Sequence, residues 1–302
     1  MRLAELFSTA SHEIAPKPRD NELDLFGLTH PGKVRKENQD HFLLCTVHPQ
    51  LVIHGTSLPN TSELPLRGQR LATMILVADG VGGGAAGGEA SRLAVETIMR
   101  YATSSLRSYH ASGTHDEAFL DALRAAAREA HEAVLADAVG RNESQPRATT
   151  LTLGIAVWPW LYVVQVGDSR CYYFYDGALR QVTRDQTLAQ DLIDQGVLPR
   201  ERARASPFNN VLSSAIGGAE ARPDVTRVNI SQRGCVVLVC SDGLTKHVTD
   251  AEIARHLAEM RSAHQVCNAL LDLALDRGGT DNITIVVGRA PVVKGERREL
   301  TA

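Results

Sequence analysis

Short apolar runs rich in β-branched residues recur along the chain and predict β-strands. They cover residues 23–28, 41–46, 72–78, 149–157, 161–166, 170–175, 225–230, 236–240 and 283–287. Most of these runs are short and are separated by turn residues, which is typical of antiparallel sheets. A Trp-Pro-Trp sequence at residues 158–160 lies between two of them and indicates a tight turn.

Two pairs of longer segments carry apolar residues at helical spacing. The first pair covers residues 89–106 and 116–138, and the second covers 250–260 and 264–275. Thr249 and Glu252 have the spacing of a capping box at the start of the third helix. Helix pairs among antiparallel strands predict an α+β fold, a four-layer αββα sandwich of two antiparallel sheets flanked by helix pairs.

A single domain is predicted for residues 23–290, because no linker rich in Ser, Pro or Gly divides this part of the chain. Residues 1–22 are expected to form an N-terminal extension, and residues 291–302 a charged C-terminal tail. Residues 184–218 contain few apolar anchors and are expected to form a surface flap. Residues 48–70 are an insertion between two strands, either a disordered loop or a docking surface.

Composition describes an ordinary globular protein and excludes several classes of partner. Hydrophobic residues make up 43% of the chain and charged residues 22%, which is sufficient for a large core. The net charge of -3 excludes nucleic acid and anionic membrane surfaces as partners, since both require a basic patch. Five cysteines lie mostly in apolar runs without C-x-x-C spacing, so we expect reduced core residues and a cytoplasmic location.

Three aspartates stand at the ends of apolar runs. Asp79 and Asp242 each follow a run and precede a glycine, and Asp281 lies just before another run. One Asp-Gly pair is ordinary turn chemistry, but three such acids beside buried strands predict a carboxylate cluster that a hard cation must neutralise. Carboxylate-bound Mg²⁺ or Mn²⁺ can activate a water toward phosphorus, so phosphoester hydrolysis is the first enzymatic hypothesis.

Two other classes of enzyme fit the sequence less well. The stretch GLTHPGKV at residues 27–34 is close to a nucleotide-binding P-loop, but Val34 cannot supply the metal-binding hydroxyl. No cysteine has an arginine six residues later, as a cysteine-dependent phosphatase would require. Arg35 could bind a phosphate through its planar guanidinium, although an arginine here is also typical of an ordinary surface loop.

Six stretches, taken together and in order, resemble the protein phosphatase 2C family of metal-dependent Ser/Thr protein phosphatases, in particular its bacterial branch. They are VRKENQD (34–40), VADGVGG (77–83), ATTLTLGIAV (148–157), VGDSR (166–170), CSDGL (240–244) and GGTDNITIVV (278–287). The resemblance implies the four-layer sandwich with metals in a cleft at one edge. It also implies that a metal-bridging hydroxide hydrolyses phosphoserine and phosphothreonine in proteins.

The resemblance implies a centre of two Mn²⁺ or Mg²⁺ ions, with a position for a third. Asp79 would bridge two ions, and the carbonyl of Gly80 would bind one of them. Asp242 and Asp281 would hold the other ion. Asp168 would bind the third ion together with Asp242, although a purely structural turn remains the alternative for Asp168.

The remaining site residues implied by the resemblance lie just before the second strand. Arg35 matches the phosphate-binding arginine, and Asp40 matches the acid that supports metal-bound water. With Asp79 and Asp242 they make up the expected catalytic set. Gln39 stands where many members have Glu, and whether its amide binds metal is left open.

The resemblance also implies partners. Bacterial members commonly oppose Ser/Thr protein kinases, so we expect phosphoprotein substrates and a cognate kinase. The alternative is a catalytically impaired family member that acts as a regulatory binding module. The presence of Asp79, Asp242 and Asp281 favours the enzyme over that alternative.

Overall fold

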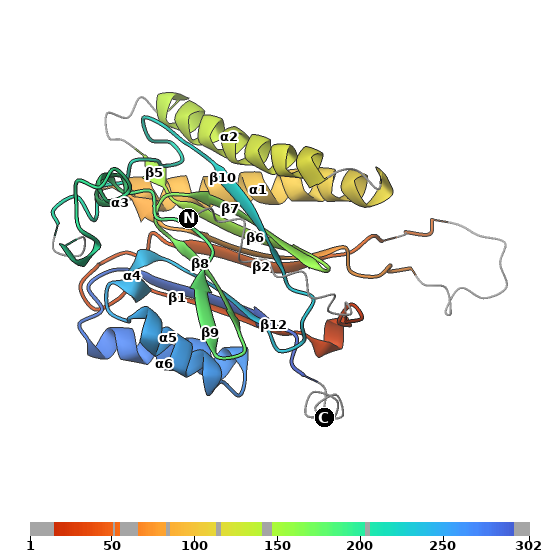
Figure 1. Cartoon of the computed structure of the whole chain (residues 1–302). Helices are drawn as coiled ribbons and strands as arrows, with labels where there is room; N and C mark the ends of the chain where they lie inside the picture. Colours follow the sequence, from red (N-terminus) through yellow and green to blue (C-terminus); the bar gives the residue numbers. More distant parts are fainter. Residues whose placement is uncertain are drawn as a thin grey trace.

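The computed structural model describes residues 15–50, 52–54, 66–82, 85–112, 116–140, 147–202 and 206–292. These residues form four layers, in the order helices, sheet, sheet, helices (Figure 1). The outer layers are α1 (Ala85–Ser112) with α2 (Asp116–Gly140), and α4 (Asp242–Thr245), α5 (Asp250–Ala258) and α6 (Ala263–Asp276). The predicted αββα sandwich is therefore confirmed. Most of the predicted extension and tail, and the middle of the 48–70 insertion, lie outside the described residues.

Each of the two large sheets contains five antiparallel strands. One has the order β1 (Asp24–His30), β12 (Ile283–Arg289), β11 (Val236–Cys240), β8 (Arg170–Tyr175) and β9 (Ala178–Gln181). The other has the order β10 (Asp224–Asn229), β7 (Trp160–Val166), β6 (Leu151–Val157), β3 (Ala72–Ala78) and β2 (His41–Val47). The two short strands β4 (Gly80–Val81) and β5 (Ala148–Thr149) pair with each other.

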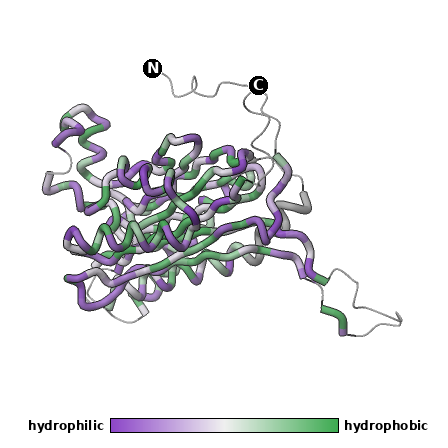
Figure 2. The backbone as a smooth tube through the Cα atoms, turned by 90° about the horizontal axis from the view of Figure 1, so that it is seen from below, coloured by the Kyte–Doolittle hydropathy of each residue, from purple (hydrophilic) through white to green (hydrophobic). Residues whose placement is uncertain are grey.

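Strand β3 shows why several of the apolar runs are continuous instead of alternating. Met74 and Leu76 belong to the core between this sheet and helices α1 and α2. Ile75 and Val77 face the other way and belong to the core between the two sheets. Each buried side chain of this size contributes about 1.5–3 kcal/mol of transfer free energy. Figure 2 shows hydrophobic positions concentrated along the central strands and hydrophilic positions along the outer helices and loops.

Apart from shifts of one or two residues at strand ends, the structure differs from the predicted strands in two places. The predicted strand at residues 149–157 is interrupted at Thr150, because this residue leaves the ladder to hydrogen-bond with Asp79. Strand β9 was missed by the hydrophobic pattern. Its signal is the turn Asp176-Gly177, in which both residues have positive φ (50° and 76°), as a tight hairpin requires.

Helix α1 begins at Ala85, four residues before the predicted start, and includes two glycines in its first turn. Glycine is unfavourable inside a helix by about 1 kcal/mol, so a tertiary contact must compensate. A Cβ atom on Gly87 would lie 2.9 Å from the carbonyl carbon of Gly80. The glycine therefore lets the helix approach the turn that follows Asp79.

Two smaller expectations, on a helix cap and on the cysteines, are confirmed. Thr249 and Glu252 form the predicted capping box of α5, in which each side chain binds the other residue's main-chain N–H. All five cysteines are free, and only Cys45 is partly exposed. In the part of the chain that the structure describes, no helix has the length and apolar character to cross a bilayer.

Residues 184–202 and 206–218 form an irregular segment with α3 (Leu188–Asp194) and the 3-10 helix η3 (Arg200–Arg202). The segment lies at one end of the sandwich (Figure 1). Thr187 caps α3 by accepting a hydrogen bond from the N–H of Gln190. The N–H of Leu188 donates to the carbonyl of Val211 at 2.8 Å, which joins the beginning of the segment to its far side.

Candidate active site

Strand register brings Asp40 and Asp79 together. His41 opposes Ala78 in the β2–β3 ladder, so the acid just before β2 and the acid just after β3 lie side by side. The main chain of Asp79 is fixed by Thr150. The Thr150 hydroxyl accepts from the Asp79 N–H at 3.0 Å, and the Thr150 N–H donates to the Asp79 carbonyl at 2.9 Å.

The same argument places Asp168 opposite Asp242. Cys240 pairs with Arg170 in the β11–β8 ladder, and each acid lies two residues beyond this pair at the same end of the sheet. Asp242 is the first residue of α4, and Asp168 lies in the turn between β7 and β8. Both sites are therefore determined by the pairing of neighbouring strands.

Asp281 joins this group through two cations. Arg35 donates to both of its carboxylate oxygens, from Nε at 2.8 Å and from Nη2 at 3.0 Å. Lys246 Nζ lies 2.7 Å from Oδ2 of Asp281 and 2.6 Å from Oδ2 of Asp242. The sequence reading missed Lys246. Its signal was the spacing, because a lysine four residues after an aspartate on a helix lies on the same face.

Close backbone packing explains the glycines that follow two of these aspartates. A Cβ atom on Gly80 would overlap the carbonyl of Gly87 and lie 2.8 Å from the carbonyl oxygen of Gln39. A Cβ atom on Gly243 would overlap the carbonyl of Asn282. Gly80 and Gln39 are thus brought beside Asp79, as the sequence reading expected of site residues.

Asp40 is the most deeply buried acid of the group, with 3% of its surface exposed. Its Oδ2 atom accepts hydrogen bonds from the hydroxyls of Ser241 at 2.8 Å and Thr284 at 2.7 Å. Burial raises the pKa of Asp40 to about 6, although these two donors oppose the shift. Both hydroxyls were missed in the sequence, where Ser241 directly precedes Asp242 and Thr284 lies two residues after Asn282.

Two further acids have raised pKa values because they are buried and lie among other negative charges. Burial, followed by the charges of Asp40 and Asp242, raises the pKa of Asp79 well above its usual range. Burial and the charge of Asp242 raise the pKa of Asp168 to about 8. Asp281 shifts the other way. Its burial acts against ionisation, but the bonds from Arg35 and Lys246 lower its pKa.

A polar cleft of about 470 Å³ opens beside these residues. Its lining includes Arg35, Asp168, Asp242, Lys246 and Asp281, together with Asn209 and Asn210 from residues 184–218. Asp40 and Asp79 do not line the cleft; they are adjacent to the carboxylates that do.

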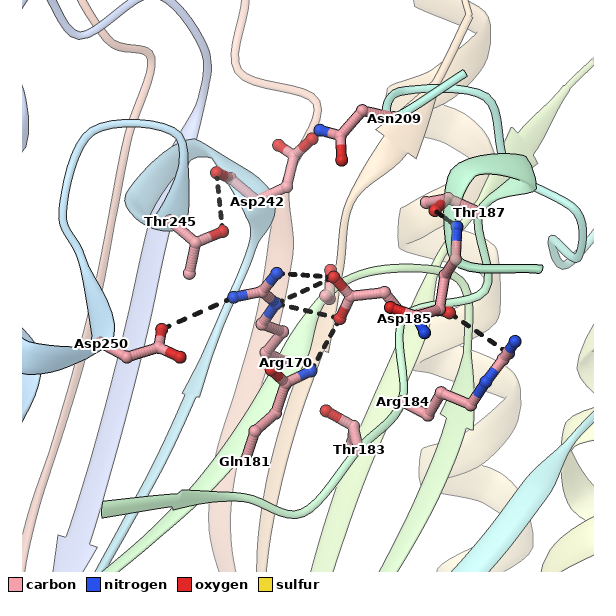
Figure 3. A network of polar contacts seen from close by, with 12 residues as sticks. Arg170, Gln181, Thr183, Arg184, Asp185, Thr187, Asn209, Asp242, Thr245 and Asp250 are labelled. Carbon is pink, nitrogen blue, oxygen red and sulfur yellow. Dashed lines mark hydrogen bonds and ion pairs between the residues drawn. The ribbon is translucent and has the colours of Figure 1, made fainter. Parts of the chain in front are cut away.

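Arg170 also lines the cleft, but its charge is already neutralised. Figure 3 shows it between Asp185 and Asp250. Its Nη2 atom lies 2.6 Å from Asp185, and its Nη1 atom lies 3.6 Å from Asp250. This pairing ties β8 to the start of residues 184–218 and leaves the aspartates of the cleft with a surplus of negative charge.

The donor set suits a hard divalent cation. Every acidic candidate offers carboxylate oxygen, which Mg²⁺ and Mn²⁺ prefer. Oδ1 of Asp40 and Oδ1 of Asp242 are buried, and within the described residues neither has a hydrogen-bond partner. In this arrangement no three Asp, Glu, His or Cys side chains of the described ranges are assembled as a metal site. The ammonium of Lys246 lies between two of the candidates instead.

The chain is similar to known phosphatases in sequence. The sequence profile of protein phosphatase 2C matches residues 66–274. The serine/threonine protein phosphatase PstP of Mycobacterium tuberculosis is 34% identical over 216 residues, which are 72% of this chain and 40% of that protein. The serine/threonine phosphatase stp of Listeria monocytogenes is 29% identical over 260 residues, 86% of this chain and 92% of that protein. The chain thus spans 40% of the length of PstP.

A solved structure has the same fold and contains metal. It is the catalytic domain of PstP in complex with two manganese ions, and it aligns with a TM-score of 0.69 and 28% identity. The alignment covers 89% of this chain and 99% of that domain.

Proposed function

Because the chain belongs to the protein phosphatase 2C family, we propose that it hydrolyses phosphoserine and phosphothreonine in proteins with bound Mn²⁺ or Mg²⁺. The observation that carries this proposal is the convergence of five aspartates at one end of the sandwich. They are Asp40, Asp79, Asp168, Asp242 and Asp281. Their surplus negative charge is costly unless cations neutralise it. The two manganese ions of the PstP catalytic domain support a metal centre of the same kind.

In this proposal two ions, with a position for a third, are held by Asp79, Asp168, Asp242 and Asp281 and by the carbonyl of Gly80. When bound, the ions supply a water of lowered pKa and neutralise the phosphate. Gln39 lies beside Gly80, where its amide could serve as a further neutral ligand. The oxygen donors lie at the end of β3, between β7 and β8, after β11 and before β12, and they suit ions that tolerate mixed carboxylate, carbonyl and water ligands.

In this proposal Arg35 binds the phosphate of the substrate, and Asp40 accepts a proton. The side chain of Arg35 is 56% exposed at the cleft, and its guanidinium has N–H donors beyond the two that bind Asp281, so it can bind phosphate oxygens. Asp40 presents Oδ1, which no described residue binds, and its pKa near 6 lets this atom accept a proton around neutral pH. Ser241 and Thr284 hold Oδ2 and thereby fix the orientation of the carboxyl group.

We place this activity in a cytoplasm, opposite a Ser/Thr protein kinase that produces the phosphoprotein substrates. The five free cysteines support a reducing compartment. A catalytically impaired regulatory module is the weaker candidate, because every acid that the proposed centre needs is present and lies at the same end of the sandwich.

Hydrolysis of a phosphothreonine peptide after EDTA treatment tests the proposal. Activity should be absent without metal, should appear as Mn²⁺ is titrated in, and should be lost in Asp242→Asn. Asp272→Asn is the matched control, because Asp272 is exposed on α6, outside the cluster. Near-normal turnover of Asp242→Asn at saturating Mn²⁺ would contradict the assignment of this residue. No turnover of the folded wild type at any Mn²⁺ concentration would favour the regulatory module.

A further inference from the structure

Lys246 lies between the two aspartates that are proposed to share one metal ion. Its Nζ atom is 2.6 Å from Asp242 Oδ2 and 2.7 Å from Asp281 Oδ2, so one ammonium group bridges both carboxylates. The lysine side chain is 28% exposed, and each aspartate side chain is 19% exposed. The group is therefore shielded enough for its charge to act strongly.

The main chain fixes where this ammonium can reach. Lys246 is the C-cap residue of α4, and its N–H donates to the carbonyl of Asp242 at 2.8 Å. Asp242 begins the same one-turn helix, so the two side chains lie on one face at a spacing of four residues. The lysine is consequently tethered beside this carboxylate pair.

Apart from Lys246, the two aspartates have different surroundings. Asp281 is already bound by the guanidinium of Arg35, while Oδ1 of Asp242 is buried without a partner in the described part of the chain. A divalent ion that used both carboxylates would meet Lys246 on the Oδ2 atom of each. Two cations cannot share these two oxygen atoms without strong repulsion.

Building on the proposed function, we propose that Lys246 is a resident cation that competes with the divalent metal for Asp242 and Asp281. In the metal-free protein it holds the two carboxylates together and offsets their repulsion. Metal can bind both carboxylates only when the ammonium moves away. Lys246 is therefore a positioning residue that makes the site stable without metal and lowers its affinity for metal.

In this proposal Lys246 stabilises the metal-free protein but weakens metal binding. This combination distinguishes its role from that of an ordinary ion pair. Removal of the Lys246 charge should destabilise the metal-free protein and tighten metal binding. A lysine that only supported the architecture of the site would change stability in the same direction, but its loss would leave metal binding unchanged or weaker.

The test is calorimetric titration of Mn²⁺ into metal-stripped wild type, Lys246→Met and Lys246→Arg. Lys246→Met should lower the Kd of the weaker site by about tenfold or more, within the range expected for groups next to metal ligands. Lys246→Arg retains the charge and should stay within a few-fold of wild type. Lys36→Met removes the same charge from an exposed residue after Arg35, so it controls for long-range electrostatics and should resemble wild type.

Thermal unfolding in EDTA supplies a second measurement that needs no metal. The Tm of Lys246→Met should be lower than that of wild type, and saturating Mn²⁺ should raise the Tm of the variant by more. Lys246→Gln, which can still hydrogen-bond to one carboxylate, serves if the methionine variant does not fold.

An unchanged or higher Kd in folded Lys246→Met or Lys246→Gln, with wild type active and binding Mn²⁺, would overturn the competition and leave the proposed function intact. Binding of Mn²⁺ to neither wild type nor variant would overturn both proposals. Tight binding in the variant together with undetectable binding in wild type would support the competition directly.

Discussion

Both ends of the sandwich carry many charged residues, but the acids are paired with cations to different extents at the two ends. At the end away from the cleft, three acids are each paired with a different arginine. The pairs are Asp20 with Arg70 at 2.6 Å, Asp24 with Arg289 at 2.9 Å and Glu22 with Arg233 at 3.2 Å. At the cleft end five aspartates share two cations, Arg35 and Lys246, since Arg170 is bound to Asp185.

The buried polar atoms without a hydrogen-bond partner also differ between the ends. They belong to a cationic side chain at one end and to anionic side chains at the other. At the far end, Nε and Nη1 of Arg233 are buried without an acceptor among the described residues. At the cleft end, the atoms without partners are oxygens of Asp40 and Asp242. Matched charges hold the fold together, whereas an excess of buried carboxylate indicates a site kept for a cation.

The largest effect is expected when an acid is removed from the cleft end. Asp79→Asn should reduce Mn²⁺-dependent phosphatase activity by about 100-fold or more, at or beyond the upper end of losses caused by residues next to metal ligands. The metal-free Tm should not fall, because a repelling carboxylate has been removed. Activity and thermal unfolding in EDTA check the two effects. A large drop in the Tm with retained activity would show that Asp79 is structural.

Removal of a cation from the far end should lower stability and leave activity unchanged, which is the reverse of the effect expected for Asp79→Asn. Arg70 is 7% exposed and also donates to the carbonyl of Pro18 at 2.7 Å. Arg70→Met should lower the free energy of unfolding by about 1–3 kcal/mol, because these charge-assisted bonds are lost. Urea unfolding measures this change. kcat/KM should stay at the wild-type value, and the exposed Arg67→Met variant should match wild type in both measurements.

A smaller effect is expected at the substrate side of the cleft. Arg35→Ala should raise KM about tenfold with a smaller change in kcat, because it removes about 1.4 kcal/mol of phosphate binding while Asp281 keeps its bond to Lys246. Arg35→Lys should lie between wild type and Arg35→Ala, since lysine keeps the charge but cannot bind two oxygens through a planar fork. Steady-state kinetics with a phosphothreonine peptide distinguishes these variants. A fall in kcat with unchanged KM would assign Arg35 a role other than phosphate binding.

The smallest effect is a pH dependence of the metal-free protein. The pKa of Asp168 is raised to about 8, whereas an unfolded aspartate titrates near 3.9. Between pH 6.5 and 8.5 the folded state therefore binds protons that the unfolded chain has released, and stability falls as the pH rises. The Tm in EDTA should drop by a few degrees, since about 1 kcal/mol corresponds to ~2–4 °C for a domain of this size.

Two controls isolate this pH effect. Asp168→Asn should flatten the decline, and saturating Mn²⁺ should abolish it by holding the carboxylates ionised. A Tm in EDTA that rises between pH 6.5 and 8.5 would contradict the raised pKa of Asp168.

Local patterns determined most of the fold. The apolar runs of β3, β8 and β11 were predicted with the same bounds that the structure shows. Thr150 and the first turn of α1 were predicted less well, because their conformations depend on contacts with Asp79 and Gly80, which are distant in sequence. Long-range hydrogen bonds and backbone contacts override local propensity at these positions.

The sequence by itself determined which residue types stand at the strand ends, and hence the family and an acidic site. It could not determine the pairing of Asp242 with Lys246 and Asp281, or that of Arg170 with Asp185. These contacts depend on strand register and helix placement, which the whole packed core determines, and not on neighbouring residues. Only the tertiary structure therefore decided which charges are neutralised and which remain available for a cation.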